Sequence, residues 1–200
     1  PRLTGDTYVV ELDVPQSSIV FGQPGLRRDD ADWYTGLVMN YILGGGGFSS
    51  RLYSEVREKR GLAYSIRTSL HPMRLSALIS GGAGTKNANV AESLKTIRAE
   101  WDRMRTGGVT ADELSSAKSY LTGSFPLRLS STDRIARMLV SIQYHNLGIG
   151  YINKRANYIN VVSTESIAKL ARRLLDTGKL TFVVVGKPAA VTSTAPAPQI

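Results

Sequence analysis

Hydrophobic and polar positions recur along the chain with two periods, which predicts both strands and helices. Alternating or continuous apolar runs rich in β-branched residues predict strands at 7–14, 17–23, 62–70, 74–82 and 180–185. Apolar residues at helical spacing predict helices at about 29–43, 86–106, 110–126, 132–146 and 151–160, and one more from residue 163. The first two strands are expected to be neighbours. This order predicts an α+β fold, a two-layer sandwich in which helices cover one face of an antiparallel or mixed sheet.

The domain organisation follows from a change in composition near the end of the chain. After Pro188 the residues are mostly Ala, Thr, Ser and Pro, so 189–200 is expected to be a disordered tail or linker. Residues 1–188 are expected to form a single domain. Because the sequence begins at Pro1 and not at Met, we expect a processed form or an excised piece.

Composition and charge narrow the possible functions. The 200 residues include 25 Lys and Arg against 16 Asp and Glu, a formal net charge of +9. Nucleic-acid binding is one interpretation, but the arginines are scattered, which favours a basic surface dispersed over several helices. No apolar run approaches the roughly 20 residues of a membrane-spanning helix. The absence of cysteine excludes disulfides and thiolate metal sites.

The stretch from Leu43 to Ser65 contains the candidate chemistry. Its four consecutive glycines, Gly44 to Gly47, allow positive φ angles, and Ser49 or Ser50 can then cap the N-terminus of a short helix. A phosphate-binding loop needs a preceding strand and a closing Gly-Lys-Ser/Thr, which are missing here. Anion binding at the helix start stays open, but a tight helix–helix connection that lets another backbone approach closely is the favoured interpretation.

The histidines do not support a metal site on this chain. His71 and His145 are the only two, and neither belongs to a His-x-x-Glu-His or His-x-x-x-His spacing. A catalytic zinc ion needs about three protein ligands, so zinc bound by this chain alone is not expected. The same scarcity argues against a Ser-His-Asp triad.

Arg57 and Tyr64 are the strongest candidates for chemistry. They flank one predicted helix-to-strand turn, with Gly61 in the left-handed position that ends the helix. Arg57 offers a charged fork of donors and Tyr64 a hydroxyl, which together can hold a peptide carbonyl or a developing oxyanion. The structural alternative makes Arg57 a helix-end cation. In that alternative Tyr64 is a core residue, alternating inward with Leu62 and Ile66.

The stretch LGGGGFSSRLYSEVREKRGLAYS, residues 43–65, closely resembles a signature of the pitrilysin and mitochondrial processing peptidase family of zinc metallopeptidases. The order of the predicted elements is similar over residues 7–186. In that family homologous α+β domains form a clamshell, and zinc is bound by His-x-x-Glu-His in one of them. The signature belongs to the second domain, which carries no zinc and faces the substrate.

The resemblance implies roles for Arg57 and Tyr64 in reaching the bound peptide's carbonyl, while water activated by zinc on another domain attacks it. No zinc ligand or general base can be carried over to this chain, which should be inactive alone. The glycine turn is a further candidate for substrate contact: Gly46, Gly47, Phe48 and Ser49.

The implied partners are a zinc-bearing homologous domain or subunit and a peptide or protein substrate. The zinc motif lies either upstream in the same polypeptide or on another subunit. A bacterial periplasm or cytoplasm is favoured over the mitochondrion as the compartment. The alternative function is a non-catalytic structural or assembly domain of the same fold.

Overall fold

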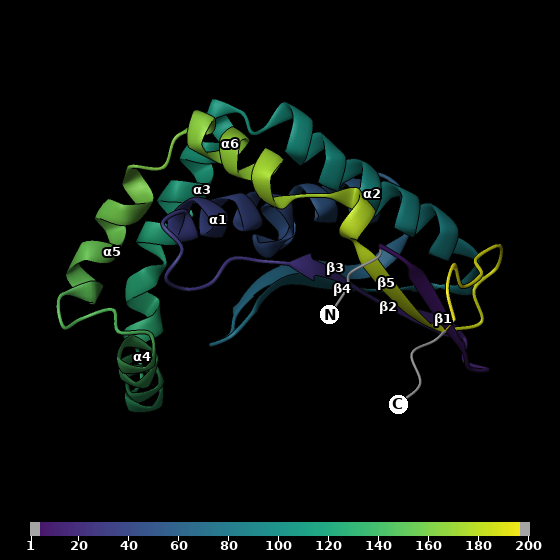
Figure 1. Ribbon diagram of the computed structural model, residues 1–200, viewed down its shortest axis with the longest axis horizontal. Helices are drawn as coiled ribbons and strands as arrows, with labels where there is room; N and C mark the ends of the chain where they lie inside the picture. Colours follow the sequence, from purple (N-terminus) through teal and green to yellow (C-terminus); the bar gives the residue numbers. More distant parts are fainter. Residues whose placement is uncertain (1–4, 197–200) are drawn as a thin grey trace.

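The computed structural model describes residues 5–196, and five strands in that range form one mixed sheet (Figure 1). The strands are β1 (Thr7–Glu11), β2 (Gln16–Pro24), β3 (Ala63–Pro72), β4 (Ala77–Lys86) and β5 (Thr181–Gly186). Their order across the sheet is β1-β5-β2-β4-β3. The predicted α+β fold with a mixed sheet is confirmed.

The predicted adjacency of the first two strands is wrong. β5, the last strand in the chain, lies between β1 and β2 and pairs in parallel with β1 and antiparallel with β2. β5 consists of apolar residues with one threonine and one glycine, as suits a strand in the middle of a sheet. Its backbone N–H and C=O groups are paired with β1 on one side and β2 on the other. β3 and β4 are neighbours and pair in antiparallel orientation.

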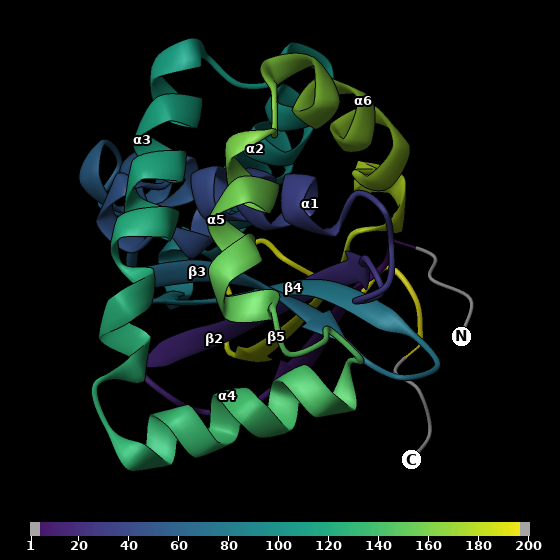
Figure 2. The ribbon, with the colours of Figure 1, turned by 90° about the vertical axis from the view of Figure 1, so that its left-hand side faces the viewer.

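Helices in residues 5–196 form a layer over one face of the sheet (Figures 1 and 2). The α-helices are α1 (Trp33–Asn40), α2 (Val90–Gly107), α3 (Ala111–Gly123), α4 (Thr132–Tyr144), α5 (Tyr151–Asn160) and α6 (Thr164–Leu174). Two π-helical turns, η1 (Tyr41–Gly45) and η3 (Tyr53–Glu58), flank the short 3₁₀ turn η2 (Gly47–Ser49). The single helix predicted to end near residue 43 therefore finishes as a π-turn.

The core lies between the sheet and the helical layer, and α2 contributes much of it. One face of this helix points inward, where Val90, Leu94, Ile97, Trp101 and Met104 are all buried. Trp101 packs edge-on against Phe21 of β2 with 5.9 Å between ring centroids. Its indole N–H donates to Oε1 of the buried Gln23 at 2.8 Å, which satisfies a polar group in an apolar region.

α4 stands apart from the helical layer. It lies beyond the end of the sheet where β3 and β4 join, and Figure 2 shows it on the other side of the sheet from the layer. Ile142 is its only buried residue. Its exposed hydrophobic residues are Ile135, Leu139, Val140 and Tyr144.

Part of the segment 189–200, expected to be a disordered tail or linker, lies against β1. Residues after β5 turn back along β1, where Thr194 N–H donates to the Thr7 carbonyl at 2.9 Å. The Ser193 hydroxyl accepts from the Val9 N–H at 2.9 Å, and Val191 packs against the core. Small hydroxyl residues can do this because they supply bonds to the free edge of β1. Residues 197–200 lie outside the described range.

Candidate functional site

The glycine run is a close-packed turn on β3. A Cβ added at Gly44 would lie 2.6 Å from Oγ1 of Thr68, and one at Gly45 would lie 2.6 Å from Nδ2 of Asn40. Only Gly47 within the run has a positive φ, of 57°. Gly44 and Gly45 must be glycine because neighbouring atoms approach too closely for a side chain, which agrees with the interpretation of a tight connection. Gly47 must be glycine because of its positive φ angle.

The predicted capping role of Ser49 or Ser50 is wrong. The Ser50 hydroxyl donates back to the Gly47 carbonyl at 2.7 Å, and neither serine side chain accepts from the new helical turn. The Ser50 carbonyl accepts instead from the Ser54 N–H at 3.0 Å. The turn is thus closed within itself, which leaves Phe48 projecting outward with 75% of its surface exposed.

The turn between Arg57 and Tyr64 is held by backbone bonds. The Gly61 N–H donates to the Arg57 carbonyl at 3.0 Å, and the Leu62 N–H donates to the Val56 carbonyl at 2.8 Å. Gly61 has the predicted left-handed conformation, with a φ of 59°. Arg57 and Tyr64 are both exposed on either side of this turn.

A β-bulge turns Tyr64 to the outside. Ala63 is paired with Thr85 and Ser65 with Gly84, so Tyr64 is an extra residue in β3. The bulge changes the alternation: Ala63 and Ile66 are buried, whereas Tyr64 is 52% exposed. The alternative in which Tyr64 is a core residue alternating inward with Leu62 and Ile66 is wrong. An aromatic side chain is instead presented to solvent at the start of an edge strand.

Arg57 contacts Tyr53, which in turn contacts Phe48 of the glycine turn. Its guanidinium lies 4.9 Å from the centroid of the Tyr53 ring and donates to the Tyr53 hydroxyl. Phe48 meets the Tyr53 ring edge-on, at 4.8 Å between centroids. Tyr53 was not among the residues predicted from the sequence. Its spacing of four from Arg57 on a helix was the available signal.

The glycine-turn candidates are only partly accessible. Gly47, Phe48 and Ser49 are exposed, whereas Gly46 packs closely on the Tyr41 ring. The structure brings Phe48 and Arg57 together through Tyr53. Direct substrate contact by any of these residues stays a prediction.

Three charged residues of the stretch form ion pairs that the sequence did not reveal. Glu55 accepts from Lys59 at 2.6 Å and is also bonded to Arg60, so both basic residues after Arg57 are already paired. Those bonds, first that from Arg60, lower the pKa of Glu55. Arg57, in contrast to Lys59 and Arg60, has no ion pair among the described residues.

No cluster of three or more His, Cys, Asp or Glu side chains that could hold a metal ion occurs in residues 5–196. His71 lies exposed on β3 and His145 follows α4. The donor set of the described chain does not fit a zinc site. None of the helices in this range is long and apolar enough to cross a membrane.

Residues 1–121, more than half of the chain, match the family model of the peptidase M16 inactive domain. The chain belongs to this family. A protein named uncharacterized zinc protease of Streptomyces coelicolor is 39% identical over 132 residues, which are 66% of this chain and 28% of that protein. A non-peptidase homolog of Helicobacter pylori is 29% identical over 178 residues, covering 88% of this chain and 41% of that protein.

Solved structures share the fold of this M16 domain. The crystal structure of a peptidase M16 inactive domain from Pseudomonas fluorescens superposes with a TM-score of 0.83 at 30% identity, over 93% of this chain and 44% of that one. A chain of complex III2 from Candida albicans gives 0.78 over 90% and 45% at 13% identity, which shows the fold alone. The chain spans less than half of the length of these relatives.

The resemblance inferred from residues 43–65 is therefore confirmed, including its assignment to the family's inactive domain. The homologues support a non-catalytic domain of the M16 fold. The lack of a metal-binding group in residues 5–196 fits the inactive domain that the family model describes.

Proposed function

We propose that this M16 domain is the substrate-binding half of a zinc-dependent endopeptidase clamshell. The main support for the proposal is the exposed position of Tyr64 at the bulge. A β-bulge interrupts the regular hydrogen bonding between two strands and changes the direction in which a side chain points. Such bulges are enriched beside active sites. Zinc is expected on a homologous domain, upstream in the same polypeptide or on another subunit, which the residues of this chain would face.

The edge of the sheet supplies a place for extended peptide. β3 pairs with β4 on one side, and among the described strands it is an edge strand. A peptide can add to such an edge through main-chain hydrogen bonds, with weak dependence on sequence. Tyr64 stands at the start of that edge, where a bound peptide's carbonyl would meet its hydroxyl.

Arg57 and Tyr64 can then act on one carbonyl group. The Tyr64 hydroxyl donates a hydrogen bond to the carbonyl oxygen and to the oxyanion that forms from it. Arg57 keeps its positive charge throughout, and its bond to Tyr53 leaves donors of the guanidinium fork available. Stacking on Tyr53 limits the freedom of Arg57 before substrate arrives, which is the preorganisation that stabilises a developing charge.

Replacement of Tyr64 by phenylalanine in the full-length protein tests this role. Loss of one oxyanion donor typically lowers kcat by about 100-fold or more, so we expect a fall of that order with zinc content unchanged. Tyr8→Phe on β1, at the opposite edge of the sheet, is the matched control and should keep normal turnover. Normal turnover by Tyr64→Phe would remove this hydroxyl from the mechanism.

A structural or assembly domain is the second candidate function. α4 has a single buried residue and several exposed apolar residues. An exposed apolar surface of this kind is usually covered by a partner, which favours the assembly function. Under this alternative, the domain reconstituted with the rest of its protein shows no specific peptide binding. Saturable binding of an extended peptide to that assembly would contradict it.

A further inference from the structure

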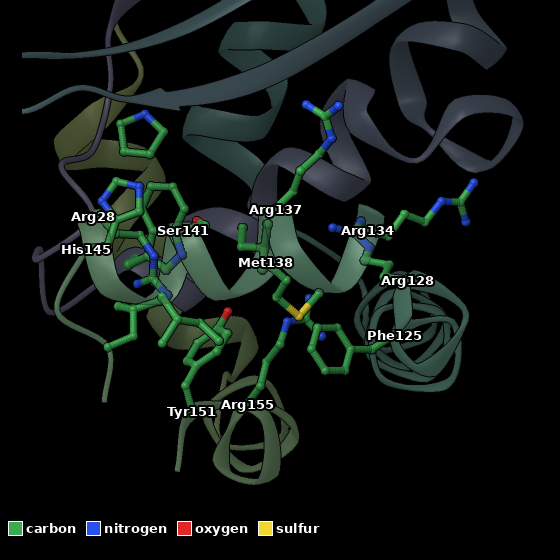
Figure 3. A pocket seen from close by; sticks show the side chains of 15 residues that line it. Arg28, Phe125, Arg128, Arg134, Arg137, Met138, Ser141, His145, Tyr151 and Arg155 are labelled. Atoms are coloured by element: carbon green, nitrogen blue, oxygen red, sulfur yellow. The ribbon is translucent and has the colours of Figure 1, made fainter. Parts of the chain in front are cut away.

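A large cavity lies at the other end of β3 from Tyr64. It has a volume of about 500 Å³ and opens between α4, α5, the start of α1 and Pro72 at the end of β3 (Figure 3). A strand rises about 3.3 Å per residue, so the eight positions from Tyr64 to Pro72 span roughly 26 Å. The cavity is therefore separate from the Arg57 and Tyr64 pair.

Its walls combine apolar surface with an excess of positive charge. Phe125, Met138, Ile142 and Trp33 supply apolar and aromatic surface. Arginine side chains line the same cavity, and no aspartate or glutamate does: the arginines are Arg28, Arg128, Arg134, Arg137 and Arg155. Arg137 alone among these five has an ion pair within the described residues, with Asp133 at 3.0 Å.

Arg155 is the deepest of these cations, with only 5% of its surface exposed. Its guanidinium lies 4.4 Å from the Phe125 ring centroid and donates to the Leu121 carbonyl at 2.8 Å. Burial lowers the pKa of Arg155, since desolvation disfavours the charged form. No carboxylate in the part of the chain described here compensates this charge, although buried charges are normally paired.

A second guanidinium, that of Arg28, is held against aromatic side chains in the same cavity. Arg28 donates to the Tyr34 hydroxyl at 3.1 Å and lies 4.9 Å from the Trp33 ring and 5.6 Å from the Tyr151 ring. Burial, the largest influence, raises the pKa of Tyr34 to about 12, so this hydroxyl stays neutral beside Arg28. Aromatic contacts fix the direction of the guanidinium without neutralising it.

We propose that this cavity binds an acidic peptide in trans, taking a carboxylate on Arg155 and Arg128 and the neighbouring apolar side chain against Phe125 and Met138. The two oxygens of a carboxylate can accept two parallel hydrogen bonds from one guanidinium. Binding of a carboxylate would also provide the negative charge that Arg155 lacks within the described chain. A volume near 500 Å³ has room for such a pair of side chains. The proposal does not depend on the role of Arg57 and Tyr64.

Fluorescence titration of this chain tests the proposal, because Trp33 lines the cavity while Trp101 is fully buried in the core. The probe is a capped hexapeptide of alternating glutamate and leucine. The matched peptide has glutamine in place of glutamate. We expect a saturable change in Trp33 emission with the acidic peptide and no saturation with the glutamine peptide. Equal binding of both peptides would overturn the proposal.

Three variants locate the binding. Arg155→Met should weaken binding about tenfold or more, as expected for a lost bond between charged groups. Arg128→Gln, at an exposed position where folding is not at risk, should weaken it about two- to fivefold. Arg172→Gln on α6 removes the same charge outside the cavity and should bind as the unaltered chain does.

Three results would reject the assignment. An equal loss in Arg172→Gln and Arg128→Gln would mean that only overall charge matters. Tighter binding of phenyl phosphate than of the acidic peptide would make the site a phosphate site. The full-length protein must also bind the acidic peptide with the same Arg128 dependence, since failure there would overturn binding in trans.

Discussion

At the scale of single residues, Arg51 shows how the signature stretch is fixed to the rest of the domain. Arg51 is buried, and its Nε and Nη2 donate to the two carboxylate oxygens of Glu113, both at 2.6 Å. Glu113 also accepts from the Thr110 N–H in the capping box that begins α3. The pair therefore joins the turn before Arg57 to a helix 62 residues away. Loss of Glu113 would leave a buried cation without its partner.

Glu113→Gln should lower the free energy of unfolding by roughly 2 kcal/mol at pH 7, because Arg51 loses a charged acceptor. Chemical denaturation measures this difference. Glu58→Gln is the matched control, since Glu58 is exposed and has no ion pair among the described residues. An unchanged midpoint for Glu113→Gln would mean that the ion pair adds no stability.

The same pair makes stability depend on pH. Burial opposes ionisation of Glu113, but the bonds from Arg51 and Thr110 outweigh it, and the pKa falls below its ordinary value of 4.5. Its contribution is present above about pH 4.5 and is lost as the pH falls through the lowered pKa. The difference between the unaltered chain and Glu113→Gln should therefore shrink below pH 4.5.

At the scale of elements, the glycine turn and β3 form one unit. Two π-helical turns enclose the glycines, and such turns often occur at functional sites. Gly44 is buried against Thr68 of β3 and Leu52 after the turn. The position of Phe48 on one side and of the Tyr64 bulge on the other thus depends on close contact between the glycines and β3.

Gly44→Ala should destabilise the domain by about 1–3 kcal/mol, because the new methyl group would lie 2.6 Å from Oγ1 of Thr68 in a packed region. Thermal unfolding measures the change. Gly123→Ala near the end of α3 is the control, since an added Cβ there meets nothing within 4 Å. Equal melting temperatures for the two variants would show that the turn tolerates a side chain.

The sequence predicted elements better than their arrangement. Apolar spacing located the helices expected at 86–106 and 110–126, which the structure shows as α2 and α3. It did not predict that β5 separates β1 from β2, because that pairing joins residues more than 150 positions apart.

The residue pattern also could not predict the bulge at Tyr64 or the arginine-lined cavity. The bulge at Tyr64 depends on the register with β4, which alternation within β3 does not contain. The arginine-lined cavity forms from residues of α1, α4 and α5 that are distant in the sequence. The resemblance of residues 43–65 to the family signature added information that single residues did not contain. It favoured functional roles for Arg57 and Tyr64, for which the chemistry of the side chains alone had left structural alternatives open.

At the scale of the whole molecule, this domain is less than half of the proteins that it resembles. Its described residues offer an exposed Arg57 and Tyr64 at one end of β3 and the cavity at the other. They offer no group of metal ligands. Those features suit a domain that holds peptide while the metal chemistry takes place elsewhere, as proposed above.

Peptide cleavage by the full-length protein, alone and mixed with a homologous zinc-bearing subunit, tests this account most directly. We expect cleavage that a chelator abolishes, and in whichever preparation cleaves, Tyr64→Phe should slow turnover about 100-fold while Tyr8→Phe does not. Cleavage by the protein alone places zinc in its own remaining half, and cleavage only in the mixture places it on the partner. No chelator-sensitive cleavage in either preparation would contradict the peptidase account and favour the assembly role.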